Sequence, residues 1–214
     1  MDFILAALDY VLHLDRHIDG LWQLYGVWLY AIVFAIVFAE TGLVVTPWLP
    51  GDSLLFVLGA LAAAGGPNVG VLIALLFLAA VLGNTSNYWI GRWIGPRVFH
   101  FPDSVLFSKA TLEKAHGFYE RHGAITVMAS RFLPLIRTFA PFVAGVGAMS
   151  HTKFQFYSIL GGGLWVLCFV LAGYFFGQIP IVKNNLPLVI VGVIFVSFLP
   201  LAVEFARTKL AKKN

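Results

Sequence analysis

The feature that most constrains this chain is a long stretch almost without charge. Between Leu21 and Gly91 the only charged residues are Glu40 and Asp52. Over the whole chain 60% of the residues are hydrophobic and 11% are charged, whereas soluble domains carry about 25% charged residues. Because a soluble protein of 214 residues needs polar side chains to cover its surface, this composition predicts an all-α, multi-pass membrane protein with a single membrane domain.

Apolar runs predict about four full transmembrane helices, because each run is long enough to cross about 30 Å of hydrocarbon. The predicted spans are Leu21–Ala39, Val69–Ile90, Phe154–Gly177 and Leu186–Ala206. Two amphipathic helices are also expected to lie in the membrane interface. One covers residues 2–19, where polar side chains form a stripe, and the other lies within the polar loop 92–122.

The distribution of basic residues predicts how the chain is oriented. The loop 92–122 and the tail 207–214 are rich in Lys and Arg, so both are expected in the cytoplasm. Two cytoplasmic segments must be separated by an even number of membrane crossings, and the spans Phe154–Gly177 and Leu186–Ala206 already supply two. The proline-broken segment 124–149, which also lies between them, must therefore enter and leave on the cytoplasmic side. By the same count the segment 40–64 enters and leaves on the outer side, and both termini are cytoplasmic.

These two segments are therefore predicted to be re-entrant helical hairpins that enter from opposite faces, the pattern of an inverted repeat. Prolines are expected to break each hairpin. Irregular backbone at membrane depth is tolerated where protein or a water-filled cavity surrounds it, so the two tips are expected to meet inside the protein. The hairpin-breaking prolines are Pro47, Pro50, Pro134 and Pro141.

Four charges lie in the two hairpins: Glu40, Asp52, Arg131 and Arg137. Each charge at bilayer depth costs roughly 2.5–3.5 kcal/mol, so pairing or water must offset a total of roughly 10 kcal/mol. One interpretation is that structural salt bridges hold the hairpins, and another is that the arginines snorkel to the interface. The functional interpretation is favoured because apolar packing could replace structural pairs, because arginine suits phosphate and because a desolvated glutamate suits proton exchange.

Several ordered motifs then indicate a family. The chain resembles the bacterial DedA family, whose membrane domain is also called the VTT or SNARE-associated domain, over nearly its whole length. The motifs that carry the resemblance are FAETGLVVTPWLPGDSLLFVLGAL, NYWIGR, FYERHG, SRFLPLIRTFAPFVAGVGAM and AGYFFG.

This resemblance implies a lipid transporter. Bacterial members are implicated in proton-dependent return of undecaprenyl phosphate across the inner membrane, and distant eukaryotic relatives in phospholipid scrambling. It implies proton-coupling roles for Glu40 and Asp52 and phosphate-binding roles for Arg131 and Arg137. One departure is Asn84, which stands where many members have an acid. Any mechanism that uses an acid there is in doubt for this chain.

Two other functions are compatible with the sequence. A proton-driven antiporter of a small solute or drug and a non-catalytic membrane scaffold remain alternatives. An enzyme is not expected: Ser130-Arg131 resembles part of a lipid-phosphatase signature, but that chemistry needs a histidine nucleophile in an ordered motif. Metal binding at His13 and His17, nucleic-acid binding and a cofactor other than the proton gradient are not expected, and a homo-oligomer is compatible with the sequence.

Overall fold

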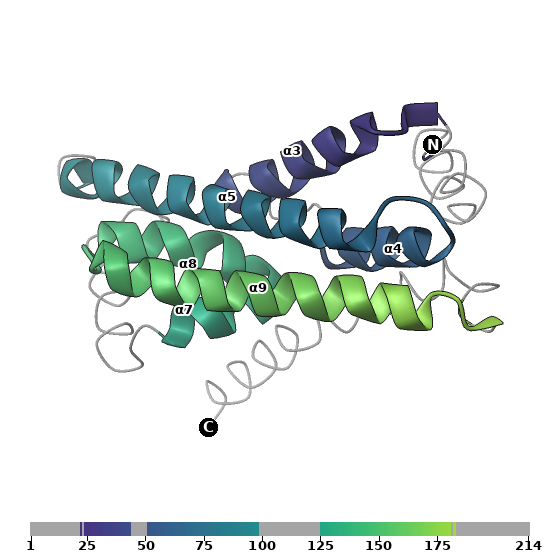
Figure 1. The fold of residues 1–214 in the computed structure, drawn as a ribbon. Helices are drawn as coiled ribbons and strands as arrows, with labels where there is room; N and C mark the ends of the chain where they lie inside the picture. The colour runs from purple at the N-terminus through teal and green to yellow at the C-terminus, as the bar shows by residue number, and fades with distance from the viewer. Residues whose placement is uncertain (1–21, 23, 44–50, 99–124, 181, 183–214) are drawn as a thin grey trace, which may run out of the picture. The chain divides into compact units, whose positions relative to one another are not determined.

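The chain is helical wherever its structure is described. The computed structural model describes residues 22, 24–43, 51–98, 125–180 and 182 (Figure 1). These residues contain no strand, so the all-α class is confirmed for them. The helices are α3 (Trp28–Gly42), α4 (Gly51–Ala63), α5 (Val69–Val98), α7 (Ile125–Ala129), the 3-10 helix η1 (Ser130–Phe132), α8 (Pro134–Val146) and α9 (His151–Phe176).

Among the described residues, two helices are long and apolar enough to cross a membrane. They are Val69–Ile94 of α5 and α9, each with 26 residues, against the about 20 that a crossing needs. They correspond to the predicted spans Val69–Ile90 and Phe154–Gly177. Only 33% of the residues in each apolar window are buried, so most of this apolar surface points outward, as contact with lipid requires.

The other apolar helices are shorter. α3 has 15 residues and begins after a turn at Gly26, whose φ is +47°, so it is shorter than the span predicted over Leu21–Ala39. The span Leu186–Ala206, the interfacial helix 2–19 and the tail 207–214 lie outside the described residues. The count of four full spans and the two re-entrant hairpins therefore stay predictions.

The chain divides into two compact units. The first contains Met1–Phe34, Pro50–Leu76 and Val166–Asn214, and the second contains Ala35–Leu49 and Phe77–Trp165. Each of the helices α3, α5 and α9 contributes residues to both units.

In the first unit a capped turn joins α4 to α5. Gly65 has φ +93°, a conformation that glycine adopts without steric cost. The side chain of Asn68 then accepts hydrogen bonds from the backbone N–H groups of Gly70 and Val71, at 2.9 and 3.1 Å, and so caps α5. The backbone N–H of Asn68 donates to the Tyr30 hydroxyl at 2.7 Å. Gly65–Asn68 therefore forms the turn between α4 and α5.

Glycines let α4 and the end of α9 touch through their backbones. A Cβ at Gly173 would collide with the carbonyl oxygen of Phe56, and a Cβ at Gly59 would collide with that of Val170. Gln178 adds a hydrogen bond from its amide to the carbonyl of Ala60, at 3.2 Å. Close approach at small residues is how helices pack without a hydrophobic driving force in lipid.

In the second unit an aromatic cluster and further glycines pack α5 against α8 and α9. Tyr88 is fully buried, stacks on Phe154 with ring centroids 4.4 Å apart, and its hydroxyl donates to the carbonyl of Met149. A Cβ at Gly91 would collide with the carbonyl oxygen of Phe142, and one at Gly145 with that of Tyr88. α5 and α8 are therefore in backbone contact.

The structure corrects the predicted role of Pro141 and shows where α5 ends. Pro141 was predicted to break the second hairpin, but it lies inside α8, which continues to Val146. A proline there removes one backbone hydrogen bond, and a helix held by buried neighbours on both sides, here Ala140 and Phe142, tolerates that loss. α5 continues to Val98, so this helix extends into the first residues of the predicted polar loop 92–122. The rest of that loop lies outside the described residues.

The glycine contacts generate a stability prediction. Gly173→Ala should destabilise the protein by about 1–3 kcal/mol, the usual cost of overpacking, because its methyl group meets the backbone of α4. Gly163→Ala in the same helix is the matched control, since its Cβ would lie 3.5 Å from the Phe77 ring, an ordinary contact. Thermal unfolding in detergent checks this, and equal melting temperatures for the two variants would contradict it.

Candidate functional site

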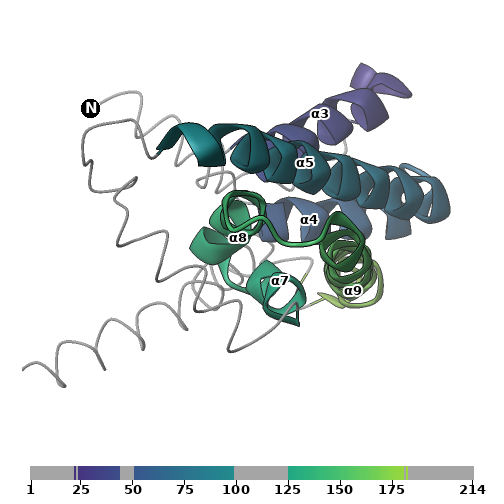
Figure 2. The same ribbon diagram turned by 90° about the vertical axis from the view of Figure 1, so that its left-hand side faces the viewer.

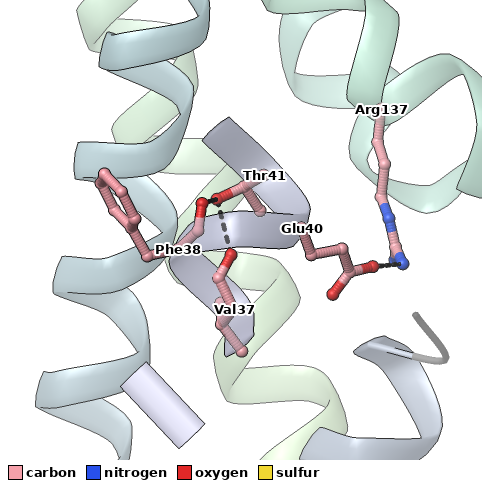
Figure 3. Close-up of polar contacts among 5 residues, drawn as sticks. All are labelled: Val37, Phe38, Glu40, Thr41 and Arg137. Atoms are coloured by element: carbon pink, nitrogen blue, oxygen red, sulfur yellow. Dashed lines mark hydrogen bonds and ion pairs between the residues drawn. The ribbon is translucent and has the colours of Figure 1, made fainter. Parts of the chain in front are cut away.

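A buried ion pair joins Glu40 to Arg137. Glu40 lies in the last turn of α3 and is 1% exposed. Its Oε1 accepts a hydrogen bond from Nη2 of Arg137 in α8, and Figure 3 shows the two side chains pointing toward one another. A carboxylate near a helix C-terminus faces the negative end of the helix dipole. The arginine therefore offsets both that repulsion and the loss of water.

The neighbour of Glu40 ties back to its own helix. The hydroxyl of Thr41 lies 2.8 Å from the carbonyl oxygen of Val37 and 3.5 Å from that of Phe38 (Figure 3). Thr41 also contacts α5, because a Cβ at Gly83 would collide with its Oγ1. Because Gly83 of α5 has no side chain, the turn of α3 that carries Glu40 can pack directly against α5.

A break in the helix places the two arginines. Arg131 lies in η1, and Leu133 then takes an extended conformation, with φ −116° and ψ 103°. Pro134 occupies the first turn of α8, where its fixed φ and missing N–H suit a helix start. Figure 2 shows α7 and α8 as separate helices. The break predicted beside Pro134 is present, and because of it Arg131 and Arg137 do not follow the spacing of one continuous helix.

Arg131 is as deeply buried as Glu40 but is only partly bonded. It is 2% exposed, and its Nη2 donates to the carbonyl oxygen of Ala80 at 3.1 Å. Its Nε and Nη1 have no hydrogen-bond partner among the described residues. It is close enough to both Glu40 and Arg137 to interact with their charges. A buried arginine with unused donors calls for an explanation, because unmade hydrogen bonds of buried groups are costly.

Both guanidinium groups also lie over one aromatic ring. The Cζ atom of Arg131 is 5.6 Å from the ring centroid of Trp165, and that of Arg137 is 5.2 Å from it. These distances are within the range of a cation–π interaction. Trp165 lies in α9 and is fully buried. Sequence reasoning placed it in an ordinary span and missed this contact, because an apolar run gives no sign of which tryptophan faces a charge.

Asn87 links the two segments that carry the ion pair. Its side-chain amide donates to the carbonyl of Thr41 at 3.1 Å and to that of Thr138 at 2.8 Å. These residues directly follow Glu40 and Arg137. Both partners are carbonyl acceptors, so the nitrogen of the Asn87 amide, and not its oxygen, must face them. Asn87 belongs to the motif NYWIGR, but the sequence alone assigned it no role.

Further buried polar atoms lie in the same unit. Asn84 donates from its amide to the hydroxyl of Ser158 at 2.9 Å, so the residue at the position of the family acid is buried and bonded to α9. The Oδ1 atoms of Asn84 and Asn87 and the hydroxyl of Thr138 have no hydrogen-bond partner within the parts of the chain that the structure describes. The unit therefore combines buried charge with unused hydrogen-bonding capacity.

The remaining predicted site residues belong to the first unit or lie outside the described residues. Asp52 is 8% exposed in the first turn of α4, where a helix N-terminus favours a negative charge. It belongs to the first unit, so its pairing with an arginine stays a prediction. Pro47 and Pro50 lie outside the described residues, as do His13 and His17. Among the described residues no group of three His, Cys, Asp or Glu side chains could hold a metal ion.

Comparison with known proteins defines the class of this protein. A family model described as the VTT domain matches residues 49–175. The chain is 53% identical to the protein DedA of Escherichia coli strain K12 over 213 residues, which are 99% of this chain and 97% of that relative. No solved structure matches the chain.

More distant relatives are also described as membrane proteins. An uncharacterized membrane protein of Mycobacterium tuberculosis (strain CDC 1551 / Oshkosh) is 44% identical over 184 residues, 85% of this chain and 81% of the relative. The inner membrane protein YghB of Escherichia coli strain K12 is 36% identical over 185 residues, with the same coverage of 85% and 81%. The fold, its two long apolar helices and these relatives define a helical membrane protein. The chain belongs to the DedA family, whose members share the VTT domain.

The link through Asn87 gives a second prediction. Asn87→Asp keeps the shape of the side chain but replaces the amide donor by a carboxylate facing two carbonyl oxygens. We expect a loss of at least about 1–3 kcal/mol of stability, the cost of leaving buried groups unpaired. Ser86→Ala, at a half-buried position of the same helix, is the control. Thermal unfolding of both variants in detergent measures the difference, and an Asn87→Asp protein as stable as the wild type would refute the link.

Proposed function

We propose that this protein is a lipid transporter that moves a lipid phosphate across the bacterial inner membrane, with undecaprenyl phosphate or a related phospholipid as its substrate and proton coupling as its energy source. The observation that carries the proposal is the buried group of Glu40, Arg131 and Arg137. Two arginines face one glutamate, so the group has one positive charge in excess. An anion is the ligand that such a site is suited to bind.

Arginine chemistry favours a phosphate. A guanidinium presents N–H donors in a planar fork that matches phosphate oxygens, and such charge-assisted hydrogen bonds are roughly twice as strong as neutral ones. The unused Nε and Nη1 donors of Arg131 are the groups that a phosphate oxygen would accept from. The role of phosphate binding therefore falls first on Arg131, with Arg137 joining it when its ion pair opens.

Glu40 supplies the proposed proton coupling. Its carboxylate holds Arg137 while the site is empty. Protonation removes the negative charge, weakens the pair and frees Arg137 for phosphate. Release of the proton on the other side of the membrane restores the pair and expels the anion. In this proposal Asp52 is a second proton-coupling acid, and its burial in the first turn of α4 is compatible with that role.

The path of the lipid tail and the location of the protein complete the proposal. The outward apolar surfaces of α5 and α9 let the hydrocarbon tail of the lipid stay in the bilayer while its head group crosses. The process forms and breaks no covalent bond, so the proposal assigns neither an enzymatic activity nor a cofactor, and no nucleic-acid partner. The name of the relative YghB supports the inner membrane, and the basic loop and tail support cytoplasmic termini.

Reconstituted vesicles test the function directly. Purified protein should speed the movement of labelled undecaprenyl phosphate between leaflets, and a pH gradient should change the rate. Transport of a soluble cation without lipid movement would favour the proton-driven antiporter. If neither substrate moves, a scaffold that organises other membrane proteins becomes the better interpretation.

The arginines generate a third prediction. Arg131→Ala and Arg137→Ala should each slow lipid movement by more than about tenfold, because each loses charge-assisted hydrogen bonds to phosphate. Lys153→Ala removes an exposed cation of α9 and should leave the rate unchanged. Rates are compared at equal amounts of protein in the vesicles. Normal transport by both arginine variants would eliminate this site.

A fourth prediction isolates the proton. Glu40→Gln mimics the protonated acid, so it should retain phosphate binding but lose the dependence of transport on a pH gradient. Asp52→Asn is compared with it, because the two acids belong to different units. Transport rates of both variants are measured with and without a pH gradient. If Glu40→Gln keeps full gradient dependence while Asp52→Asn loses it, the proton is carried by Asp52.

A further inference from the structure

Trp165 and its neighbours form a socket for the arginines on one face of α9. Gly161 and Gly162 precede Trp165 by four and three residues, so all three share a face of the helix. A Cβ at Gly161 would lie 3.3 Å from Cγ of Arg131, and one at Gly162 would lie 3.4 Å from its Nη2. Gly161 therefore makes room for the backbone of Met128 and for the Arg131 side chain, and Gly162 lies in ordinary contact with the guanidinium group. We call Gly161, Gly162 and Trp165 the arginine socket.

The arginine socket also bears on the repulsion between the two buried arginines. Arg131 and Arg137 carry like charges and are close enough to repel each other, and the single charge of Glu40 acts on both of them. The face of an indole ring attracts a cation, and this attraction is larger when the cation is removed from water. Both guanidinium groups lie within 6 Å of the centroid of Trp165. The ring is therefore a second compensating group for the two cations.

This form of compensation differs from an ion pair in one important respect. A carboxylate that stabilises an arginine occupies its N–H donors, because those donors make the contact. An aromatic ring is attracted to the positive charge and does not occupy a hydrogen-bond donor in the plane of the guanidinium. Arg131 follows this pattern, since one donor nitrogen is bonded to Ala80 and two are without partners among the described residues.

We propose that Trp165 is a positioning residue of the anion site, which holds Arg131 and Arg137 over its ring and keeps the unused donors of Arg131 available for a phosphate group. The inference rests on the proposed function, because it assigns a role within that same phosphate site. It adds a residue for which sequence reasoning found no function. It also gives a reason for Gly161, which makes room for the Arg131 side chain beside the ring.

Two substitutions separate the aromatic face from simple filling of space. Trp165→Phe and Trp165→Met both remove the indole and leave an apolar side chain of intermediate size, but only phenylalanine retains a π face. Farnesyl phosphate, a short prenyl phosphate, serves as the probe, and farnesol is the control with the same tail and no phosphate. Binding is measured on the full-length protein in detergent, after gel filtration confirms that each variant is folded.

We expect Trp165→Phe to bind farnesyl phosphate nearly as well as the wild type and Trp165→Met to bind it about tenfold more weakly, as the loss of desolvated cation–π contacts implies. Farnesol should show no such difference. A role in packing alone would weaken both ligands together or neither. If Trp165→Met binds farnesyl phosphate as the wild type does, the role of Trp165 is refuted while the transport proposal stands.

Fluorescence provides a readout that does not need the methionine variant to fold. Phosphate binding at the two arginines should change the emission of Trp165, so farnesyl phosphate should alter the fluorescence of the wild type more than that of Trp165→Phe. An equal change in the two proteins overturns the inference. If the wild type binds no farnesyl phosphate by either method, the phosphate site fails, and the proposed function and this inference fall together.

Discussion

The structure of the second unit depends on the ion pair between Glu40 and Arg137. Both partners are almost fully buried, and a buried ion pair stabilises a protein only when its geometry offsets the loss of water. Removing either partner leaves an uncompensated charge, which costs about 3–5 kcal/mol in buried pairs. The ion pair therefore helps to hold the two helices that carry these residues in one arrangement.

The packing around the pair supports this view. Gly83 brings α5 against the end of α3 at Thr41, and Gly91 and Gly145 bring α5 against α8. Asn87 then donates to one carbonyl in each of the segments that follow the charged residues. α5 thus acts as the common support of the acid and its arginine. Small residues are needed because a larger side chain would move the backbones apart and lengthen the ion pair.

The site is more positive than a structural salt bridge requires. A pair needs one arginine, and this unit buries two, of which Arg131 keeps unused donors beside Trp165. Apolar packing could replace a purely structural pair at no loss of stability. This arrangement supports the proposed anion site, and membership of the DedA family makes a lipid phosphate the substrate to test first.

The sequence by itself determined the class of the protein and predicted which charged residues would need compensation. Its apolar runs predicted the long helices that are now α5 and α9, and its few charges identified Glu40, Arg131 and Arg137, since every charge at bilayer depth needs compensation. Pro134 predicted the break beside Leu133, because proline favours a helix start. Pro141 did not break α8, and nothing in the sequence distinguishes a proline at a helix start from one that packing tolerates inside a helix.

Only the tertiary structure decided which group compensates which charge. Glu40 and Arg137 are 97 residues apart, and the count of acids and bases fitted several pairings equally well. Trp165 and Asn87 had no distinguishing pattern, because one lies in an apolar run and the other in a polar motif of unassigned role. Local sequence fixes helix type and length through periodicity and backbone preferences. A pairing across helices depends on which faces meet, and here the glycines of α5, α8 and α9 set those contacts.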